Sequence, residues 1–268
     1  LMSLHREKVH PSVHLELSGK MLVDERSGFQ HIQVLDNPHF GKVLILDGVL
    51  QTTEKDSYIY HEAIVNVPVC GKRTPGKRVL VIGGGDCASV AQVLKHRSVE
   101  QVVMCELDVR VVQIAREHFP YSAALDDDRA QLVIGDGAEY VRNYSGEPFD
   151  VVIVESSDID TPARALYTPE FYQSARTVMT DDGVIIHQSG LPEQNPDCLR
   201  IAVRAMREAF AFVQPIYAPV FTYGECIAFT TGCSVDISEP SREAQGKWYT
   251  PRAHRAYFAI PACWKNLL

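Results

Sequence analysis

Hydrophobic and polar positions follow two different patterns along this chain. Up to about residue 55 they alternate over short runs, at 13–17, 30–35, 43–46 and 49–53. Such alternation is typical of strands that bury one face, and Asp47-Gly48 between the last two runs signals a tight hairpin turn. We therefore expect a small β domain of local hairpins, followed by a helix over 57–67.

Beyond residue 77 the pattern changes to continuous apolar runs. These runs cover 79–82, 102–105, 132–134, 151–154 and 184–186. The first two runs suit strands that are buried on both faces of a sheet, and the others are further strands.

Helical segments separate these apolar runs. They cover 88–96 and 109–118, and Thr168-Pro169 provides the N-cap and first helical residue of another helix. The alternation predicts an α/β fold with a parallel, doubly wound, Rossmann-like sheet. We place the N-terminal β-hairpin domain at 1–68 and the catalytic domain at 69–268.

Composition narrows the choice of partners and compartment. The 268 residues carry a formal net charge of −8, which argues against a nucleic-acid binder because such proteins neutralise phosphates with Lys and Arg. The seven cysteines include no C-x-x-C pair, so we expect reduced thiols and no metal site. No apolar run approaches the roughly 18 residues of a membrane span, and no signal peptide is visible. The sequence therefore predicts a cytoplasmic protein without a membrane partner.

A glycine-rich turn follows the first buried strand. Gly83 and Gly85, with Ala88 at the next position of the pattern, lie where a tight turn lets the backbone approach a ligand closely. Glu106 ends the following strand, where a carboxylate can bind ribose hydroxyls. These features indicate a nucleoside-containing cofactor, and both a dinucleotide dehydrogenase and an adenosyl-sulfonium enzyme fit them.

Further carboxylates follow other predicted strands. Because the carboxyl ends of parallel strands line one crevice, we expect five side chains to converge there. They are Asp86, Glu106, Asp136, Glu155 and Asp158. Any one of them could be a solvated loop residue or a helix cap, but five at one edge predict an acidic cleft that suits a cationic ligand.

Longer motifs resemble those of the spermidine synthase family. The segments concerned are 40–56, Tyr60-His61-Glu62, Val81–Asp86, Phe149–Asp158 and Tyr249–Pro261. The similarity runs from about residue 29 to the end of the chain. It implies transfer of an aminopropyl group from decarboxylated S-adenosylmethionine to an amine such as putrescine, with release of methylthioadenosine. It also implies a methyltransferase-type fold, a homodimer, a small polyamine as partner and no tightly bound cofactor.

The resemblance assigns roles to individual residues. Donor binding would fall to Gln30, His61, Gly83, Gly85, Asp86, Glu106, Asp136 and Gly137. Catalysis would involve Tyr60, Glu155 and Asp158, and Asp158 would also bind the acceptor together with Gln188 and Phe221. Residues 159–167 would form a loop that closes over the substrates.

The chain departs from the family pattern mainly on the acceptor side. Glu155 stands where the family has its catalytic Asp, Ile159 replaces a Pro, and Phe221 replaces a Tyr. On the donor side, Cys87 replaces a Gly, and Ser57 replaces the Glu before Tyr58.

Two other functions fit the same motifs. One is an S-adenosylmethionine-dependent polyamine N-methyltransferase, and the other is a catalytically weak family member that acts as a binding or regulatory partner. Asp86 favours aminopropyl transfer, because it would repel the carboxylate of intact S-adenosylmethionine. A nicotinamide dehydrogenase would need a hydride-transfer site, for which the sequence offers no candidate.

Overall fold

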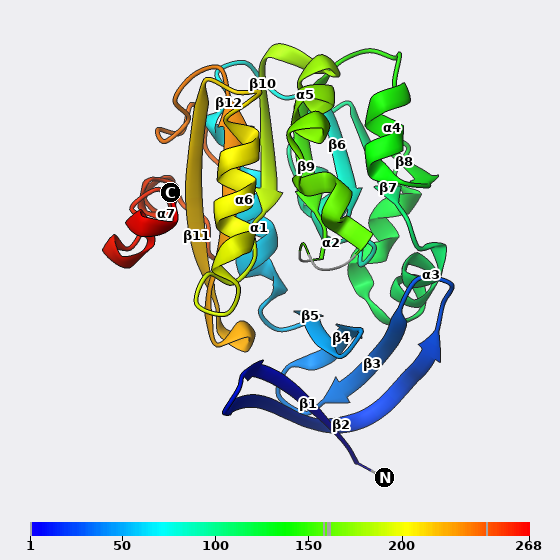
Figure 1. Ribbon diagram of the computed structural model, residues 1–268. Coiled ribbons are helices and arrows are strands. Elements are labelled where there is room, and N and C mark those ends of the chain that lie inside the picture. The colour runs from blue at the N-terminus through cyan, green and yellow to red at the C-terminus, as the bar shows by residue number, and fades with distance from the viewer. Residues whose placement is uncertain (1, 158, 160–161, 245) are drawn as a thin grey trace.

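The computed structural model describes residues 2–157, 159, 162–244 and 246–268 (Figure 1). Its N-terminal part is a five-stranded antiparallel sheet in the order β1-β2-β3-β4-β5. These strands are Ser3–His10, Val13–Arg26, His31–Asn37, Gly41–Leu46 and Val49–Thr53. The predicted hairpin turn is present: Asp47 and Gly48 both have positive φ, at 49° and 82°. The sequence pattern missed β1 and the length of β2.

Helix α1, Ser57–Gly71, connects the two parts of the chain. Almost all of its residues are buried, because it packs on strands of the large sheet as well as on helix α2. The helix runs across position 68, and our division of the chain at that residue stays a prediction. Its Glu62 carboxylate accepts hydrogen bonds from the backbone N–H groups of Lys247, Trp248 and Tyr249, at 2.7–2.8 Å.

The second sheet has seven strands in the order β11-β12-β10-β9-β6-β7-β8. In chain order they are Arg78–Gly83, Gln101–Glu106, Ala130–Ile134, Phe149–Glu155, Met179–Gln188, Phe212–Val220 and Glu225–Cys233. Strands β6 to β10 are parallel. The strand order reverses between β6 and β9, which makes the carboxyl ends of these two strands the expected ligand crevice.

Two antiparallel strands that were not predicted, β12 and β11, extend the predicted parallel part of the sheet, so the sheet as a whole is mixed. Strand β11 was not predicted, because Pro215 and Pro219 interrupt its strand pattern. Proline is tolerated there because β11 is an edge strand, where one row of backbone N–H groups needs no ladder partner.

Helices cover both faces of this sheet (Figure 1). They are α2 Ala88–Val93, α3 Val109–His118, α4 Gly137–Asn143, α5 Pro169–Thr177, α6 Pro196–Met206 and α7 Pro251–Tyr257. Short 3-10 helices cover Pro120–Asp126, Pro162–Tyr167, Phe221–Tyr223 and Ala262–Leu267. Thr168 caps α5 as predicted, accepting a hydrogen bond from Phe171 N. None of the described helices is long and apolar enough to cross a membrane.

Alternate residues of the central strand β6 belong to different hydrophobic clusters. Val79 and Val81 pack with residues of α1, α2 and α3, whereas Leu80 and Ile82 pack with residues of α4, α5 and α6. The strand is therefore buried on both faces, which explains its continuous apolar run. The N-terminal sheet lies across the carboxyl ends of β6 and β10 (Figure 1).

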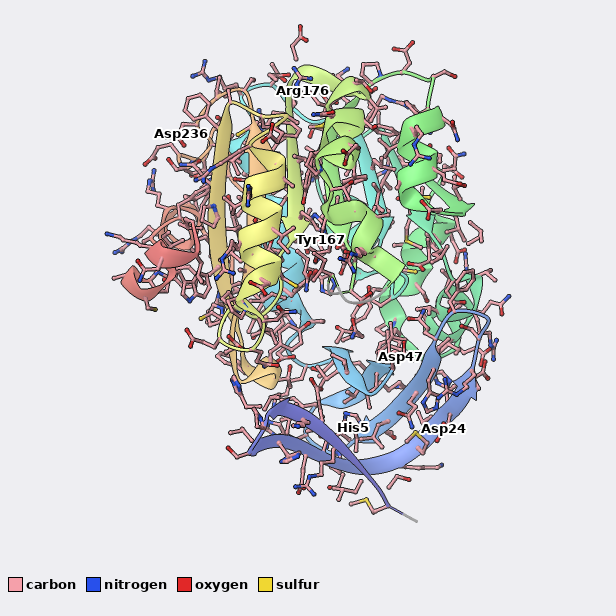
Figure 2. The ribbon with its side chains drawn as sticks, viewed as in Figure 1. His5, Asp24, Asp47, Tyr167, Arg176 and Asp236 are labelled. Atoms are coloured by element: carbon pink, nitrogen blue, oxygen red, sulfur yellow. The ribbon has the colours of Figure 1, made fainter. Side chains whose placement is uncertain are left out.

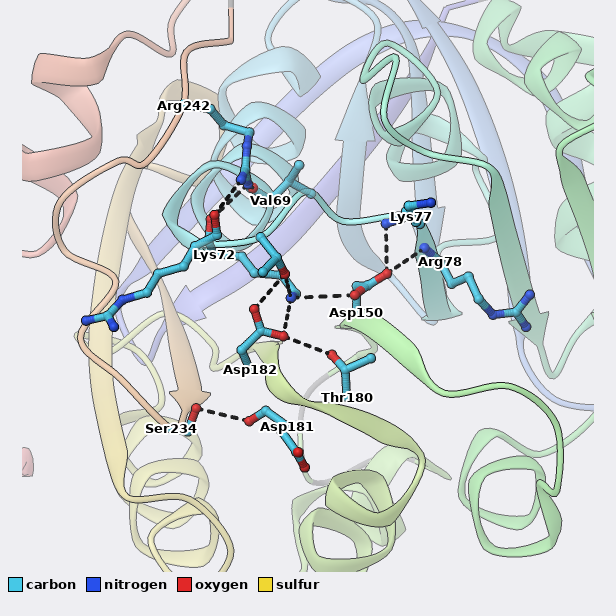
Figure 3. Close-up of polar contacts among 12 residues, drawn as sticks. Val69, Lys72, Lys77, Arg78, Asp150, Thr180, Asp181, Asp182, Ser234 and Arg242 are labelled. Carbon is cyan, nitrogen blue, oxygen red and sulfur yellow. Dashed lines mark hydrogen bonds and ion pairs between the residues drawn. The ribbon is translucent and has the colours of Figure 1, made fainter.

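A buried ion cluster lies at the opposite, amino ends of the strands (Figure 3). The Lys72 side chain is fully buried and pairs with Asp182 and, at 3.5 Å, with Asp150. Asp150 also accepts hydrogen bonds from the backbone N–H groups of Lys77 and Arg78 at 2.8 and 3.0 Å. The cluster thus joins the beginnings of β6 and β9 to the end of α1.

Candidate active site

A cavity of about 310 Å³ lies at the carboxyl edge of the large sheet. Both domains line it: Asp47 at the β4–β5 turn belongs to the N-terminal sheet, and the segment next to Tyr167 belongs to the large domain above it (Figure 2). Most of the predicted site residues line this one cavity, namely Gln30, Tyr60, His61, Gly83, Gly85, Asp86, Glu106, Asp136, Gly137, Glu155 and Gln188.

The glycines of the turn after β6 leave no room for side chains. A Cβ on Gly83, whose φ is +80°, would lie 2.1 Å from the Glu155 carbonyl oxygen. A Cβ on Gly85 would lie 2.8 Å from Val111 Cγ1. Gly137, at the start of α4, packs against β6 in the same way, since a Cβ there would lie 2.3 Å from Ile82 Cγ2. The glycines therefore keep the backbone of the turn packed against its neighbours on the cavity wall.

A histidine lies between two carboxylates at the centre of the cavity. His61 Nε2 is 3.0 Å from Glu155 Oε1 and 3.6 Å from Asp86 Oδ2. His61 Nδ1 donates to the Ser57 carbonyl oxygen at 2.7 Å, one turn earlier in α1. Glu155 Oε2 is buried and has no hydrogen-bond partner among the described residues, so this oxygen can still accept a proton or a hydrogen bond.

Burial and charge set the ionisation of this cluster. Burial alone would lower the pKa of His61, but the carboxylates of Asp86 and Glu155 outweigh it and raise that pKa to about 9. Burial raises the pKa of Asp86 to about 6, although the adjacent His61 opposes the rise. At neutral pH the cluster therefore holds an imidazolium between carboxylates.

Two further groups have altered acidity. Burial raises the pKa of Glu106 to about 7, against the effect of hydrogen bonds from the backbone N–H groups of Asp108 and Leu107. Burial raises the pKa of Tyr60 well above its usual value, and its ring packs edge-on against Phe229 and His61. Tyr60 is thus a neutral phenol that can act as a hydrogen-bond donor.

Among the described residues, the cluster of His61, Asp86 and Glu155 is also the group that could hold a metal ion. The ligand atoms of His61, Asp86 and Glu155 lie within 4.8 Å of one another. A hydrogen bond from the charged His61 to Glu155, at 3.0 Å, explains the closeness of these groups without a metal ion. Our expectation that no metal is bound stays a prediction.

The chain is similar in sequence and fold to known proteins. A family model described as "Spermine/spermidine synthase domain" matches residues 57–241. This chain belongs to the spermine/spermidine synthase family. A second model, "Spermidine synthase tetramerisation domain", matches residues 5–54, which is most of the N-terminal sheet.

Individual members of the spermine/spermidine synthase family match almost the whole chain. The polyamine aminopropyltransferase of Thermoanaerobacter is 41% identical over 254 residues, covering 92% of this chain and 91% of that protein. The polyamine aminopropyltransferase of Methanocaldococcus jannaschii is 36% identical, covering 95% of this chain and 89% of that protein.

Solved spermidine synthase structures share the fold as well. One, in complex with the transition-state analogue AdoDATO, has a TM-score of 0.93 and 32% identity, and covers 99% of this chain and 94% of the other. The spermidine synthase of Thermotoga maritima has a TM-score of 0.90 with the same identity and coverage.

Some predicted site residues make other contacts as well, or lie outside the described part of the chain. Asp136 lines the cavity and also caps α4, accepting a hydrogen bond from Glu139 N at 2.9 Å. Gln188 Oε1 accepts a hydrogen bond from the Tyr167 hydroxyl at 3.1 Å. Asp158 and positions 160–161 of the expected closing loop lie outside the described residues.

Phe221 is not brought to the cavity. Its side chain is 62% exposed and packs edge-on against Trp248, because the short helix of residues 221–223 turns it outward. The next two residues, Thr222 and Tyr223, line the cavity instead. This placement does not support our prediction that Phe221 binds the acceptor.

Sequence reasoning missed several residues of the wall. Tyr223 lines the cavity and donates its hydroxyl to the Gln51 carbonyl oxygen at 2.6 Å, which joins the large domain to β5. Ser156 also lines it and lies 3.3 Å from His187 Nε2. Ser156 lies inside the motif 149–158 but was not singled out, whereas Tyr223 belongs to no motif, so the local sequence held no signal for it.

Proposed function

We propose that this protein is a polyamine aminopropyltransferase, which moves the aminopropyl group of decarboxylated S-adenosylmethionine onto an amine. The observation that carries the proposal is the pair of buried carboxylates, Asp86 and Glu155, beside the glycine turn of a nucleoside-type crevice. Such a site suits two cationic substrates, a sulfonium and an alkylamine. Membership of the spermine/spermidine synthase family and the names of the relatives agree with it.

In the proposed reaction, the acceptor nitrogen attacks the carbon next to the sulfonium. A C–N bond forms, the C–S bond breaks, and its electron pair goes to sulfur, which leaves as the neutral thioether of methylthioadenosine. The acceptor arrives protonated, because an alkylamine has a pKa of roughly 10. Its proton must therefore be removed before or during the attack.

We propose that Glu155 is the base that takes this proton from the acceptor amine. Its Oε1 lies against His61 Nε2, while its buried Oε2 has no partner among the described residues and can accept a hydrogen bond from the attacking amine. Since the sulfonium is already a good leaving group, most of the acceleration comes from holding the two substrates in line. Tyr60, a neutral phenol beside the cluster, is suited to hydrogen-bond an amine lone pair or a carboxylate there.

Asp86 would face the ammonium at the end of the donor's three-carbon arm. It is 6% exposed, so a second negative charge beside it would be costly in this low-dielectric setting. Intact S-adenosylmethionine carries such a carboxylate. The proposal therefore includes strong preference for the decarboxylated donor.

The acceptor is an amine with an apolar chain, such as putrescine. Beyond the carboxylates the cavity wall is mainly aliphatic, with Val9, Leu15, Leu44 and Leu50 from the N-terminal sheet. Such a wall suits methylene groups. Acceptor binding by Gln188 and Asp158 stays a prediction.

We further propose that the protein is a homo-oligomer assembled through the N-terminal sheet. The match of residues 5–54 to a tetramerisation domain favours a tetramer over the homodimer expected from the sequence. Light scattering at micromolar concentration tests this: a mass near four chains supports it, and a monomer contradicts it. A cytoplasmic location stays the prediction made from the sequence.

The activity is tested with both donors and a panel of amines. We expect turnover only with decarboxylated S-adenosylmethionine, and binding of the intact donor to be weaker by a hundredfold or more, a rough figure for a buried like-charge contact. Asp86→Asn should weaken binding of the decarboxylated donor and strengthen binding of the intact one. Methyl transfer from intact S-adenosylmethionine would replace the proposal with the N-methyltransferase. Absence of turnover with every amine would favour the binding-partner role.

A further inference from the structure

A single buried carboxylate, that of Asp108, joins the two domains beside the cavity. Its Oδ2 accepts hydrogen bonds from Ser27 Oγ at 2.6 Å and from Gln30 Nε2 at 2.9 Å, both in the β2–β3 connection. Its Oδ1 accepts the hydrogen bond from Arg110 N at 3.0 Å that caps α3. Asp108 is 2% exposed, and its partners Ser27, Gln30 and Arg110 are partly buried.

These contacts decide which way the Gln30 amide points. A carboxylate oxygen can only accept hydrogen bonds, so the amide atom that faces Asp108 must be the Nε2 donor. The other amide atom, Oε1, has no partner among the described residues, and Gln30 lines the cavity. Gln30 therefore presents a hydrogen-bond acceptor to whatever the cavity holds.

The backbone of Asp108 also orients Glu106, two residues earlier in the chain. Its Oε1 accepts a hydrogen bond from Asp108 N at 2.8 Å. Its Oε2 lies toward the glycine turn, where a Cβ added to Gly85 would be 3.1 Å away. Glu106 thus also offers an acceptor to the cavity, from the opposite domain to Gln30.

We propose that Asp108 is a positioning residue for the donor nucleoside. By fixing the Gln30 amide and the Glu106 turn, it presents two acceptors, one from each domain, to the two hydroxyl donors of the ribose. The inference rests on the proposed function, because it takes the bound molecule to be a ribonucleoside. Asp108 does not itself touch the ligand.

The substitution Asp108→Asn tests the inference with little change of shape. Asn is as good a helix cap as Asp, so the fold should survive. An Asn side chain has only one acceptor oxygen, whereas Asp108 uses both of its oxygens as acceptors. If that one oxygen keeps the cap, the Asn NH₂ faces Gln30, and the Gln30 amide must turn its own NH₂ toward the ribose.

The measurement is calorimetric binding of methylthioadenosine and of its 2′-deoxy and 3′-deoxy analogues. In the parent, loss of either ribose hydroxyl should weaken binding about tenfold, the usual worth of one well-placed hydrogen bond. In Asp108→Asn the full nucleoside should bind about tenfold more weakly, and the penalty for the hydroxyl that meets Gln30 should fall toward one. The penalty for the hydroxyl that meets Glu106 should remain, because the Asp108 backbone N–H that holds Glu106 is unchanged. The KM for the donor should rise while kcat at saturation changes less than twofold.

Glu25→Gln is the matched control. Glu25 pairs with Arg110 at 2.5 and 3.1 Å, so its loss loosens the same domain contact without touching Gln30. We expect this variant to keep the full deoxy penalty. An Asp108→Asn protein that keeps both penalties, or that weakens all three nucleosides equally, overturns the positioning role while leaving the proposed function intact. A parent that binds no methylthioadenosine at millimolar concentration overturns both.

Discussion

His61 Nε2 and Glu155 Oε1 lie 3.0 Å apart, at the ends of side chains that come from α1 and β9. The contact uses the full length of the glutamate arm. An aspartate on the same backbone would end about 1.5 Å earlier, by one C–C bond. Glu155, which stands where the family has an Asp, is therefore long enough to make this ion pair with His61.

Removing the charge of Glu155 should abolish most of the activity. We expect Glu155→Gln to lower kcat by two orders of magnitude or more, a rough figure for the loss of a general base, with little change in methylthioadenosine binding. Glu155→Asp keeps the carboxylate and restores the family residue, so it should retain activity or raise it. Steady-state kinetics of both variants test the assignment. Parent-like turnover by Glu155→Gln would show that another group takes the proton.

The pKa values of two histidines near the cavity should be shifted in opposite directions from the usual value. The pKa of His61 is raised to about 9 by Asp86 and Glu155 acting against burial, whereas burial lowers that of His187 to about 3. Histidine-labelled NMR, assigned with His61→Gln and His187→Gln, should show His61 charged and His187 neutral across pH 5–8. If both titrate near 6.5, the electrostatic description of the site is wrong.

The shift at His61 also has a consequence for stability. Because its folded-state pKa lies above the unfolded value of 6.5, its ion pairs contribute fully below about pH 6.5 and are lost as the pH rises through about 9. This contribution to the free energy of unfolding should fall by roughly 2–3 kcal/mol over that range. Urea unfolding at several pH values measures it. A flat profile from pH 6.5 to 9.5 would contradict the prediction.

The buried ion cluster of Lys72 should matter for stability but not for catalysis. Lys72→Met leaves Asp150 and Asp182 without their cation, which for fully buried pairs costs about 3–5 kcal/mol. Since the Asp182 side chain is 34% exposed, we expect a smaller loss, roughly 2–3 kcal/mol. The control is Lys77→Met, which removes an exposed pair with Glu100 and should change stability by less than about 1 kcal/mol. A large loss of kcat in folded Lys72→Met would contradict the separation of the two sites.

Cys87 holds a backbone conformation that suits glycine. Its φ is +69°, and the residue is fully buried at the start of α2. Cys87→Gly and Cys87→Ala both remove the sulfur, but only alanine keeps a Cβ in the left-handed region. We therefore expect the glycine variant to be more stable than the alanine variant by about 1 kcal/mol, as measured by chemical unfolding. The opposite order would mean that the left-handed backbone at this position carries no cost.

Local patterns predicted much of this fold and the place where several carboxylates meet, whereas Gln30, Tyr60 and His61 came from the family resemblance. Helix α3 spans 109–118 as expected, and the buried runs at 79–82 and 151–154 became central strands. The convergence of Asp86, Glu106 and Glu155 followed from a general property of parallel sheets, which needs no side-chain detail.

What the sequence could not predict depends on contacts between distant segments. Gln30 and Asp108 are 78 positions apart, and the pattern around each indicates only a loop and a helix cap. Strand β11 was hidden by its prolines, since their compatibility with a strand depends on its place at the sheet edge. The orientation of Phe221 likewise depends on the turn that follows β11, and not on its own alternation.

The hydrogen bonds of Glu62 have a consequence for the order in which the chain is made. Helix α1 carries Tyr60 and His61, and the Glu62 carboxylate next to them accepts its hydrogen bonds from backbone N–H groups at 247–249. During synthesis on a ribosome, this charge stays without its partners until nearly two hundred further residues have been added. Helix α1 is thus completed by a late segment of the chain, so that a nascent chain ending before this segment has Tyr60 and His61 on a helix whose packing is incomplete.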